Sequence, residues 1–131
     1  GAYTIARPAM NIFISSNSPE SQSSTFIETV FHEGSHLLFK FGSPFTSLLY
    51  NTSQELKTEL PRNLWHACLF YVCGIVVKQE LVEYEIDHQL VMETSNIFTN
   101  YNTTLFRQSL DRYIAGEINL KETFSLILSE Y

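Results

Sequence analysis

Three side chains that could act together on one metal ion stand close in the sequence. His32, Glu33 and His36 form the pattern H-E-x-x-H inside the run from Phe31 to Leu38. One turn of an α-helix takes about 3.6 residues, so His32 and His36 would share a helix face and point at the same ion. Glu33 would reach a water molecule on that ion and act as a general base. The spacing therefore predicts two metal ligands and a base.

The residues around this pattern are typical of a half-buried helix. They are Phe26, Ile27, Val30, Phe31, Leu37 and Leu38. Two imidazoles and a carboxylate are costly to bury on such a helix unless they are used, which favours a site over an accidental pair of histidines.

The sequence also indicates where this helix begins and ends. We expect it to begin at Ser18-Pro19 or at a capping box from Thr25 to Glu28, and to end at Gly42. Glu28 then serves mainly as a capping residue. The alternative is a carboxylate one turn before His32 that orients the imidazole of this ligand.

A catalytic zinc site takes three protein ligands and leaves one position open, so a third ligand must come from elsewhere. The candidates are His66, Glu80, Glu83, Glu85 and His88. His66 is preferred because it is the one side chain between Arg62 and Lys78 that titrates near neutral pH, and it lies in the most apolar stretch of the chain. Glu80 and Glu83 remain alternatives on a polar, solvated stretch, where we also expect His88 at the surface.

The rest of the chain predicts a mainly α fold of α+β type. Residues 1–10 are expected to be irregular, and Asn11–Ser15 to form a short strand or small sheet packed beside the metal helix. Further helices are expected over residues 45–56, 62–88, 101–115 and 120–129. A chain of 131 residues is long enough for one domain, here residues 1–131, but not for two.

Composition narrows the partners. The formal net charge is -6 and no Lys/Arg cluster is present, which argues against nucleic acid and against anionic membranes. The longest apolar run, Leu64 to Val77, is shorter than the roughly 20 residues that span a bilayer, so we expect a core helix and no membrane insertion. Cys68 and Cys73 would point away from each other on one helix and are expected to be free thiols.

The chain shows no targeting signal. It starts at Gly1, so a leader removed upstream is an open alternative, and no compartment is predicted. The sequence predicts no particular oligomeric state either.

The pattern as a whole resembles small zincin-like metallopeptidase domains of the gluzincin kind. The resemblance covers the strand Asn11–Ser15, the helix with the H-E-x-x-H pattern and the stretch from Leu64 to Gly74. In related sequences a second helix carries Trp-His followed by Phe-Tyr-x-x-Gly-Glu. This chain has the Trp-His pair, but Ile75 stands where that acid would be. The metzincin continuation of the motif is excluded by Phe39 and Gly42.

The resemblance implies a zinc-dependent hydrolase that acts on a peptide or protein substrate. It implies zinc held by His32, His36 and a third residue, with Glu33 as general base and then acid. The strand Asn11–Ser15 could pair with an extended peptide. A tyrosine often stabilises the developing oxyanion in such sites, and the candidates left open are Tyr50, Tyr71, Tyr84 and Tyr101.

Two other functions are kept beside this one. The first is a non-catalytic binding or structural module on a zincin scaffold, in which the metal site is degenerate or only stabilises the fold. The second is a helical partner-binding domain that acts through its aromatic surface and depends on no metal.

Overall fold

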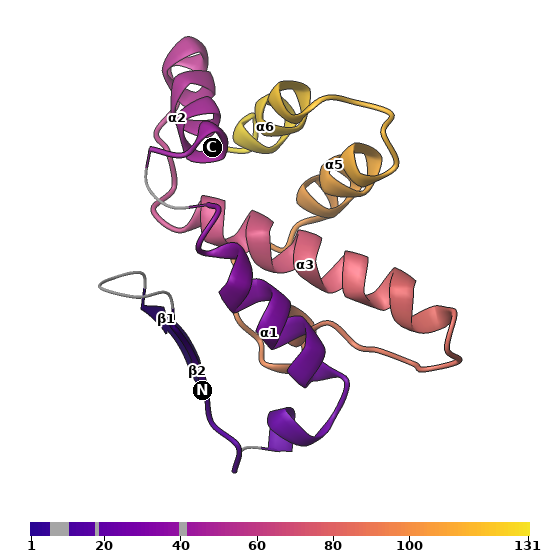
Figure 1. Cartoon of the computed structure of the whole chain (residues 1–131). Coiled ribbons are helices and arrows are strands. Elements are labelled where there is room, and N and C mark those ends of the chain that lie inside the picture. Colours follow the sequence, from indigo (N-terminus) through magenta and orange to yellow (C-terminus); the bar gives the residue numbers. More distant parts are fainter. Residues whose placement is uncertain (6–10, 18, 40–41) are drawn as a thin grey trace.

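The computed structural model describes residues 1–5, 11–17, 19–39 and 42–131. In chain order its elements are β1 (Ala2–Ile5), β2 (Asn11–Ile14), a 3-10 turn η1 (Pro19–Gln22), α1 (Thr25–Ser35), α2 (Pro44–Leu56), α3 (Leu64–Val82), α4 (Val91–Thr94), α5 (Thr104–Ile114) and α6 (Leu120–Leu128). Helix α3 runs through the middle of the molecule (Figure 1). Helix α1 and the sheet lie on one side of it, and α2, α5 and α6 on the other. The expected mainly α fold with a small N-terminal sheet is confirmed.

Helix α3 lies at the centre of the hydrophobic core. Its buried residues are Leu64, Ala67, Cys68, Leu69, Tyr71, Gly74, Val77 and Leu81. The expected continuation to His88 is wrong. Glu85 adopts a positive φ of 58°, and the Ile86 N–H donates to the Leu81 carbonyl at 3.1 Å, which ends the helix in a left-handed turn.

This helix also bears on the membrane prediction. It extends five residues beyond Val77, and Leu64–Val82 is long and apolar enough to cross a membrane by length and composition. A buried core helix meets the same criterion, and 39% of this span is buried inside the molecule. The absence of membrane insertion therefore stays a prediction.

Helix α1 differs from the expectation at both ends. Its N-cap is Ser24, which makes no side-chain capping bond, so the predicted capping box at Thr25 is wrong. The helix ends at Ser35 rather than near Gly42. The Ser35 hydroxyl donates to the His32 carbonyl at 2.5 Å, and the next turn tightens, with Leu38 N–H donating to the Ser35 carbonyl at 2.8 Å.

The predicted strand is present as β2, but it has a partner that the sequence analysis missed. Strand β1 pairs with it antiparallel, with Tyr3 opposite Phe13, and the two rings stack with centroids 4.9 Å apart. The expectation that residues 1–10 are irregular is therefore wrong for β1. A segment of four residues is too short for an alternation of apolar and polar side chains to indicate a strand.

The helices on the far side of α3 form the larger part of the core. Ser43 caps α2, with Pro44 at its first turn, and Asn119 and Glu122 form a capping box on α6. The buried side chains between these helices include Leu49, Phe106, Leu110, Phe124 and Ile127. The expected helices in these regions are confirmed, while the single turn of α4 was not expected.

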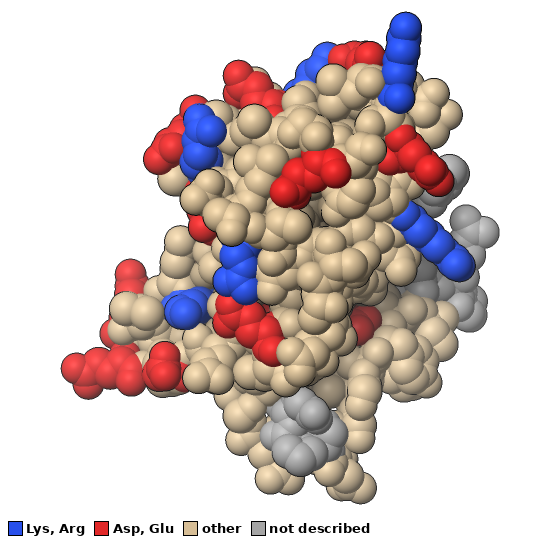
Figure 2. All heavy atoms as spheres, turned by 180° about the vertical axis from the view of Figure 1, so that it is seen from behind, with Lys and Arg blue, Asp and Glu red and all other residues tan. Residues whose placement is uncertain are grey.

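Cys68 and Cys73 are both free, as expected. Complete burial raises the pKa of the Cys68 thiol to about 12, so it behaves as a small apolar side chain. On the face drawn in Figure 2, Lys and Arg side chains are scattered among acidic and uncharged ones rather than gathered in one basic patch. That face therefore shows no basic patch that would contradict the prediction against nucleic-acid binding.

Candidate metal centre

Three histidines from two helices point their ring nitrogens at one another. His32 Nε2 lies 3.0 Å from His36 Nε2 and 3.0 Å from His66 Nε2. The ligand nitrogens of all three lie within 4.8 Å of one another, and no other group of metal-binding side chains is found among the described residues. His32 lies in the last turn of α1, His36 is the C-cap residue of this helix, and His66 stands in the first turn of α3, which packs against α1. The structure thus brings the preferred third candidate to the two histidines of the motif.

The spacing of these nitrogens fits a shared cation. Two ligand nitrogens about 2.05 Å from one tetrahedral ion would lie about 3.3 Å apart. Without an ion, His32 Nε2 carries either one proton or one lone pair, yet it faces two nitrogens. His32 Nδ1 is also buried without a hydrogen-bond partner among the described residues. A metal held by all three Nε2 atoms would resolve the conflict at His32 Nε2.

The surroundings keep these imidazoles neutral. The Phe70 ring lies over His32 with centroids 3.5 Å apart, and Trp65 stacks on His66 at 4.9 Å. Burial, with the neighbouring His36 and His66, lowers the pKa of His32 to about 3. Burial, with His36, lowers the pKa of His66 to about 4. Neutral imidazole is the form that binds metal, so the site is ready for an ion at pH 7.

Glu33, which lines the same hollow as His32, is held in place by a residue of the sheet. Its side chain is buried, and Thr4 Oγ1 lies 2.7 Å from Glu33 Oε2 and 2.8 Å from the Glu33 carbonyl. Glu33 Oε1 makes no hydrogen bond among the described residues. Thr4 of β1 thus holds one oxygen of the carboxylate, and the other oxygen is available to accept a proton. The sequence analysis missed Thr4, because a threonine 29 residues away carries no local signal.

A small hollow adjoins His32 and Glu33. It has a volume of about 260 Å³ and lies between the sheet, α1 and the segment after α4. It is lined by Gly1, Ala2, Ile14, Ser21, Thr29, His32, Glu33, Phe70, Val91, Ser95 and Ile97. A water molecule or a substrate carbonyl could approach the histidines from this side.

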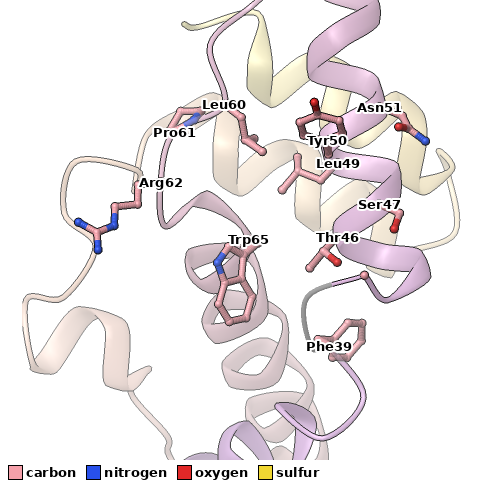
Figure 3. A pocket seen from close by; sticks show the side chains of 11 residues that line it. Phe39, Thr46, Ser47, Leu49, Tyr50, Asn51, Leu60, Pro61, Arg62 and Trp65 are labelled. Atoms are coloured by element: carbon pink, nitrogen blue, oxygen red, sulfur yellow. The ribbon is translucent and has the colours of Figure 1, made fainter.

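A second hollow lies on the other side of Trp65. Figure 3 shows Trp65, Leu60 and Leu49 facing one space between α2 and the start of α3, with the Arg62 guanidinium turned away at the rim. The volume is about 670 Å³. Trp65 also contacts His36, with ring centroids 5.8 Å apart, so this mostly apolar hollow shares a wall with the histidine cluster.

The other third-ligand candidates lie away from the cluster. Glu80, Glu83 and Glu85 are exposed. The expected surface position of His88 is wrong, because only 1% of this residue is exposed. Among the tyrosines, Tyr71 is excluded from the site, since its hydroxyl donates to Asp111 Oδ1 at 2.9 Å.

His88 is instead bonded to the metal helix. His88 Nε2 lies 2.7 Å from Glu28 Oε2, and His88 Nδ1 lies 2.9 Å from Ser24 Oγ. The Val91 N–H donates to the same Glu28 oxygen at 3.0 Å. Glu28 is completely buried and does not cap the helix, so the predicted capping role is wrong. Burial raises its pKa, although the bonds from Val91 and His88 act in the opposite direction.

Comparison of the chain with protein-family models, with curated protein sequences and with solved structures gives no match. The zincin resemblance therefore rests on the motif and its residues alone.

Proposed function

We propose that this protein is a zinc-dependent hydrolase, with a peptide or protein as substrate. The observation that supports it is that His32 Nε2 lies 3.0 Å from the Nε2 atoms of both His36 and His66, next in sequence to a buried carboxylate, Glu33. Three imidazoles are a known ligand set for catalytic zinc, which keeps its fourth position open. Glu33 is adjacent in sequence to a ligand and held by Thr4, as a positioned base should be.

The roles of the residues follow from this arrangement. His32, His36 and His66 would hold zinc, which when bound polarises the scissile carbonyl and lowers the pKa of water. Glu33 Oε1 takes the proton from the attacking water and returns it to the leaving amine. Thr4 keeps Glu33 Oε2 in place by a hydrogen bond of 2.7 Å. The aromatic rings of Phe70 and Trp65 restrict water around the imidazoles.

The two hollows adjoin the histidine cluster, one at His32 and the other behind Trp65, and each would take part of a bound peptide. The exposed strand β2 offers backbone groups to an extended peptide. The hollow behind Trp65 would take an apolar side chain near the scissile bond, because Leu49, Leu60 and Phe39 line it. Cleavage of a mixed peptide library should therefore favour bonds next to large apolar residues.

The decisive experiment compares wild type with Glu33→Gln. Purified wild type should hold about one zinc ion per chain and cleave peptides. Glu33→Gln should keep the zinc and lose turnover by about 100-fold or more, because general base catalysis contributes about 10²–10⁴-fold. Absence of zinc from wild type at neutral pH would overturn the proposal.

One observation favours a second candidate, a non-catalytic module on the same scaffold. Ile75 packs against the core at the position where the metallopeptidase family that the chain resembles carries an acid after Gly74. If that acid is essential in those proteins, zinc here would only stabilise the fold. Stoichiometric zinc without cleavage of any library peptide by wild type would support this candidate over the hydrolase.

A further inference from the structure

Two buried polar atoms on consecutive turns of α1 lack a hydrogen-bond partner among the described residues. They are Glu28 Oε1 and His32 Nδ1. Residues four apart on a helix share one face, with Cβ atoms about 5–6 Å apart. Both side chains face α3, because His32 lies against Phe70 and a Cβ on Gly74 would lie 2.9 Å from Glu28 Oε1. Phe70 and Gly74 are themselves one turn apart, so the two atoms occupy neighbouring places in one interface.

The two atoms are complementary in chemistry. If His32 Nε2 binds a metal ion, the remaining proton of the imidazole lies on Nδ1, which must then donate. Glu28 Oε1 is an acceptor without a donor. A buried polar atom left unpaired costs about 1–3 kcal/mol, and here one hydrogen bond would satisfy two such atoms.

The other oxygen of Glu28 is already committed. Glu28 Oε2 accepts from the Val91 N–H and pairs with His88 Nε2 at 2.7 Å, while His88 Nδ1 contacts Ser24 Oγ. These contacts join α1 to the segment that follows α3, and they fix the carboxylate with Oε1 turned to α3. Gly74 leaves the space that this orientation needs.

We propose that Glu28 is a positioning residue of the metal centre, which accepts a hydrogen bond from His32 Nδ1–H when the site is loaded, and that His88 holds Glu28 in place. The inference rests on the proposed metal centre, but not on hydrolysis. It predicts that the Glu28–His88 pair affects the affinity of the site for the ion and the geometry in which the ion is bound.

Zinc affinity measured by competition with a chelator tests this in the full chain. Glu28→Gln keeps the shape of the side chain and removes its charge, and it should weaken zinc binding by about 10- to 100-fold with stoichiometry unchanged. His88→Gln should weaken it less, because Glu28 is retained. The matched control is Ser109→Ala, which removes the third buried unpaired polar atom, on α5, and should leave the affinity unchanged.

A purely structural role for Glu28 predicts a different result. In that case, Glu28→Gln would lower the free energy of unfolding of the metal-free chain and leave the zinc affinity of the folded chain as in wild type. Affinities of Glu28→Gln and wild type within threefold of each other would therefore overturn the proposal.

A second readout covers the case in which Glu28→Gln does not fold. In the proton NMR spectrum of zinc-loaded wild type, the His32 Nδ1 proton should exchange slowly with water. It should also show a nuclear Overhauser effect to the side-chain protons of Glu28. Rapid exchange of that proton would overturn the inference. Zinc binding without peptide cleavage would refute the hydrolase and leave this inference standing, whereas absence of zinc binding would refute both.

Discussion

Helix α1 contributes to two clusters that contain histidine, and these clusters are completed in different ways. In the Glu28–His88 pair, the Glu28 carboxylate and the Ser24 hydroxyl satisfy both nitrogens of His88, and the Val91 N–H donates to the same Glu28 oxygen. In the cluster of His32, His36 and His66, the His32 Nε2 atom faces the Nε2 atoms of the other two, and His32 Nδ1 has no partner among the described residues. The first cluster is closed by the protein's own groups except at one atom, Glu28 Oε1, which has no partner among the described residues. The second contains three neutral bases with no acid between them, and a cation is the natural partner for such a set.

The comparison also separates what each cluster does for the fold. The Glu28–His88 pair ties α1 to residues that are 60 and 63 positions away along the chain, so it acts as a tertiary contact. The histidine cluster joins α1 to the start of α3 and leaves a hollow open beside it. The first, closed cluster links distant parts of the chain through the protein's own groups, whereas the second, open cluster offers nitrogens that a ligand can bind.

The largest expected effect breaks the open cluster. His66→Ala should reduce bound zinc from about one ion per chain to none at micromolar metal, because two imidazoles alone hold zinc weakly. His88→Gln serves as the control from the closed cluster and should keep about one ion per chain. Metal analysis after gel filtration measures both. Equal zinc content in the two variants would remove the distinction between the clusters.

The next effect probes the closed cluster through Gly74. A Cβ at this position would lie 2.9 Å from Glu28 Oε1 and 3.0 Å from Leu90 Cγ, so Gly74→Ala should lower the free energy of unfolding by about 1–3 kcal/mol. Gly34→Ala is the matched control, since its Cβ meets only Ile12 at 3.8 Å. It should raise stability by about 0.5–1 kcal/mol, the usual gain from alanine in a helix. Urea unfolding of the metal-free chains checks both signs.

Acid should destabilise the metal-free protein through the open cluster. The pKa of His32 is about 3 in the folded chain, while an unfolded histidine titrates near 6.5. The unfolded chain therefore binds more protons below pH 6.5, and stability should fall by about 1 kcal/mol per pH unit from His32 alone as the pH drops from 6.5 toward 3. Glu28 acts in the opposite direction, because its raised pKa favours proton uptake by the folded chain.

Urea unfolding at pH 7, 6, 5 and 4.5 measures this dependence. His32→Gln should make the curve less steep between pH 6.5 and 4.5, and the lowered pKa of His66 should keep part of the slope. A wild-type stability that does not change over this range would contradict a neutral buried cluster.

The smallest expected effect concerns the base beside the open cluster. Thr4→Val removes the hydrogen bond to Glu33 and should cost about 0.5–1.5 kcal/mol of stability. If the protein is a hydrolase, kcat should fall by about tenfold, the equivalent of about 1.4 kcal/mol, with zinc retained. Thr52→Val removes a similar bond inside α2, to Leu48, and should leave kcat unchanged. Equal kcat values for Thr4→Val and wild type would show that Thr4 does not position the base.

The sequence predicted the parts of the site that local spacing encodes. H-E-x-x-H on an apolar helix gave His32, Glu33 and His36, and a single histidine in an apolar stretch gave His66. Their roles as ligands and base remain predictions, although the structure brings the four residues together. The mainly α fold followed from apolar periodicity in the same way.

The rest depends on tertiary contacts that no local pattern contains. His88 stands in a polar stretch, and only the return of that segment to α1 buries it. Glu28 fits a capping box by sequence, yet a buried partner competes successfully for its carboxylate. Helix α1 ends early, where the N–H groups of Leu37 and Leu38 bond to carbonyls three residues back, and a pattern of apolar residues does not indicate this change.

The bond from Thr4 to Glu33 has a consequence for folding kinetics. The histidines lie on two helices that pack directly on each other, whereas the base depends on a two-stranded sheet of eight residues whose apolar side chains are largely exposed. An isolated hairpin is only marginally stable, so its docking should follow the pairing of the helices. During refolding in the presence of zinc, we expect metal uptake to recover before turnover, with an interval in which the chain holds its ion and is inactive. Stopped-flow zinc binding and peptide cleavage, followed in the same refolding reaction, would measure that interval.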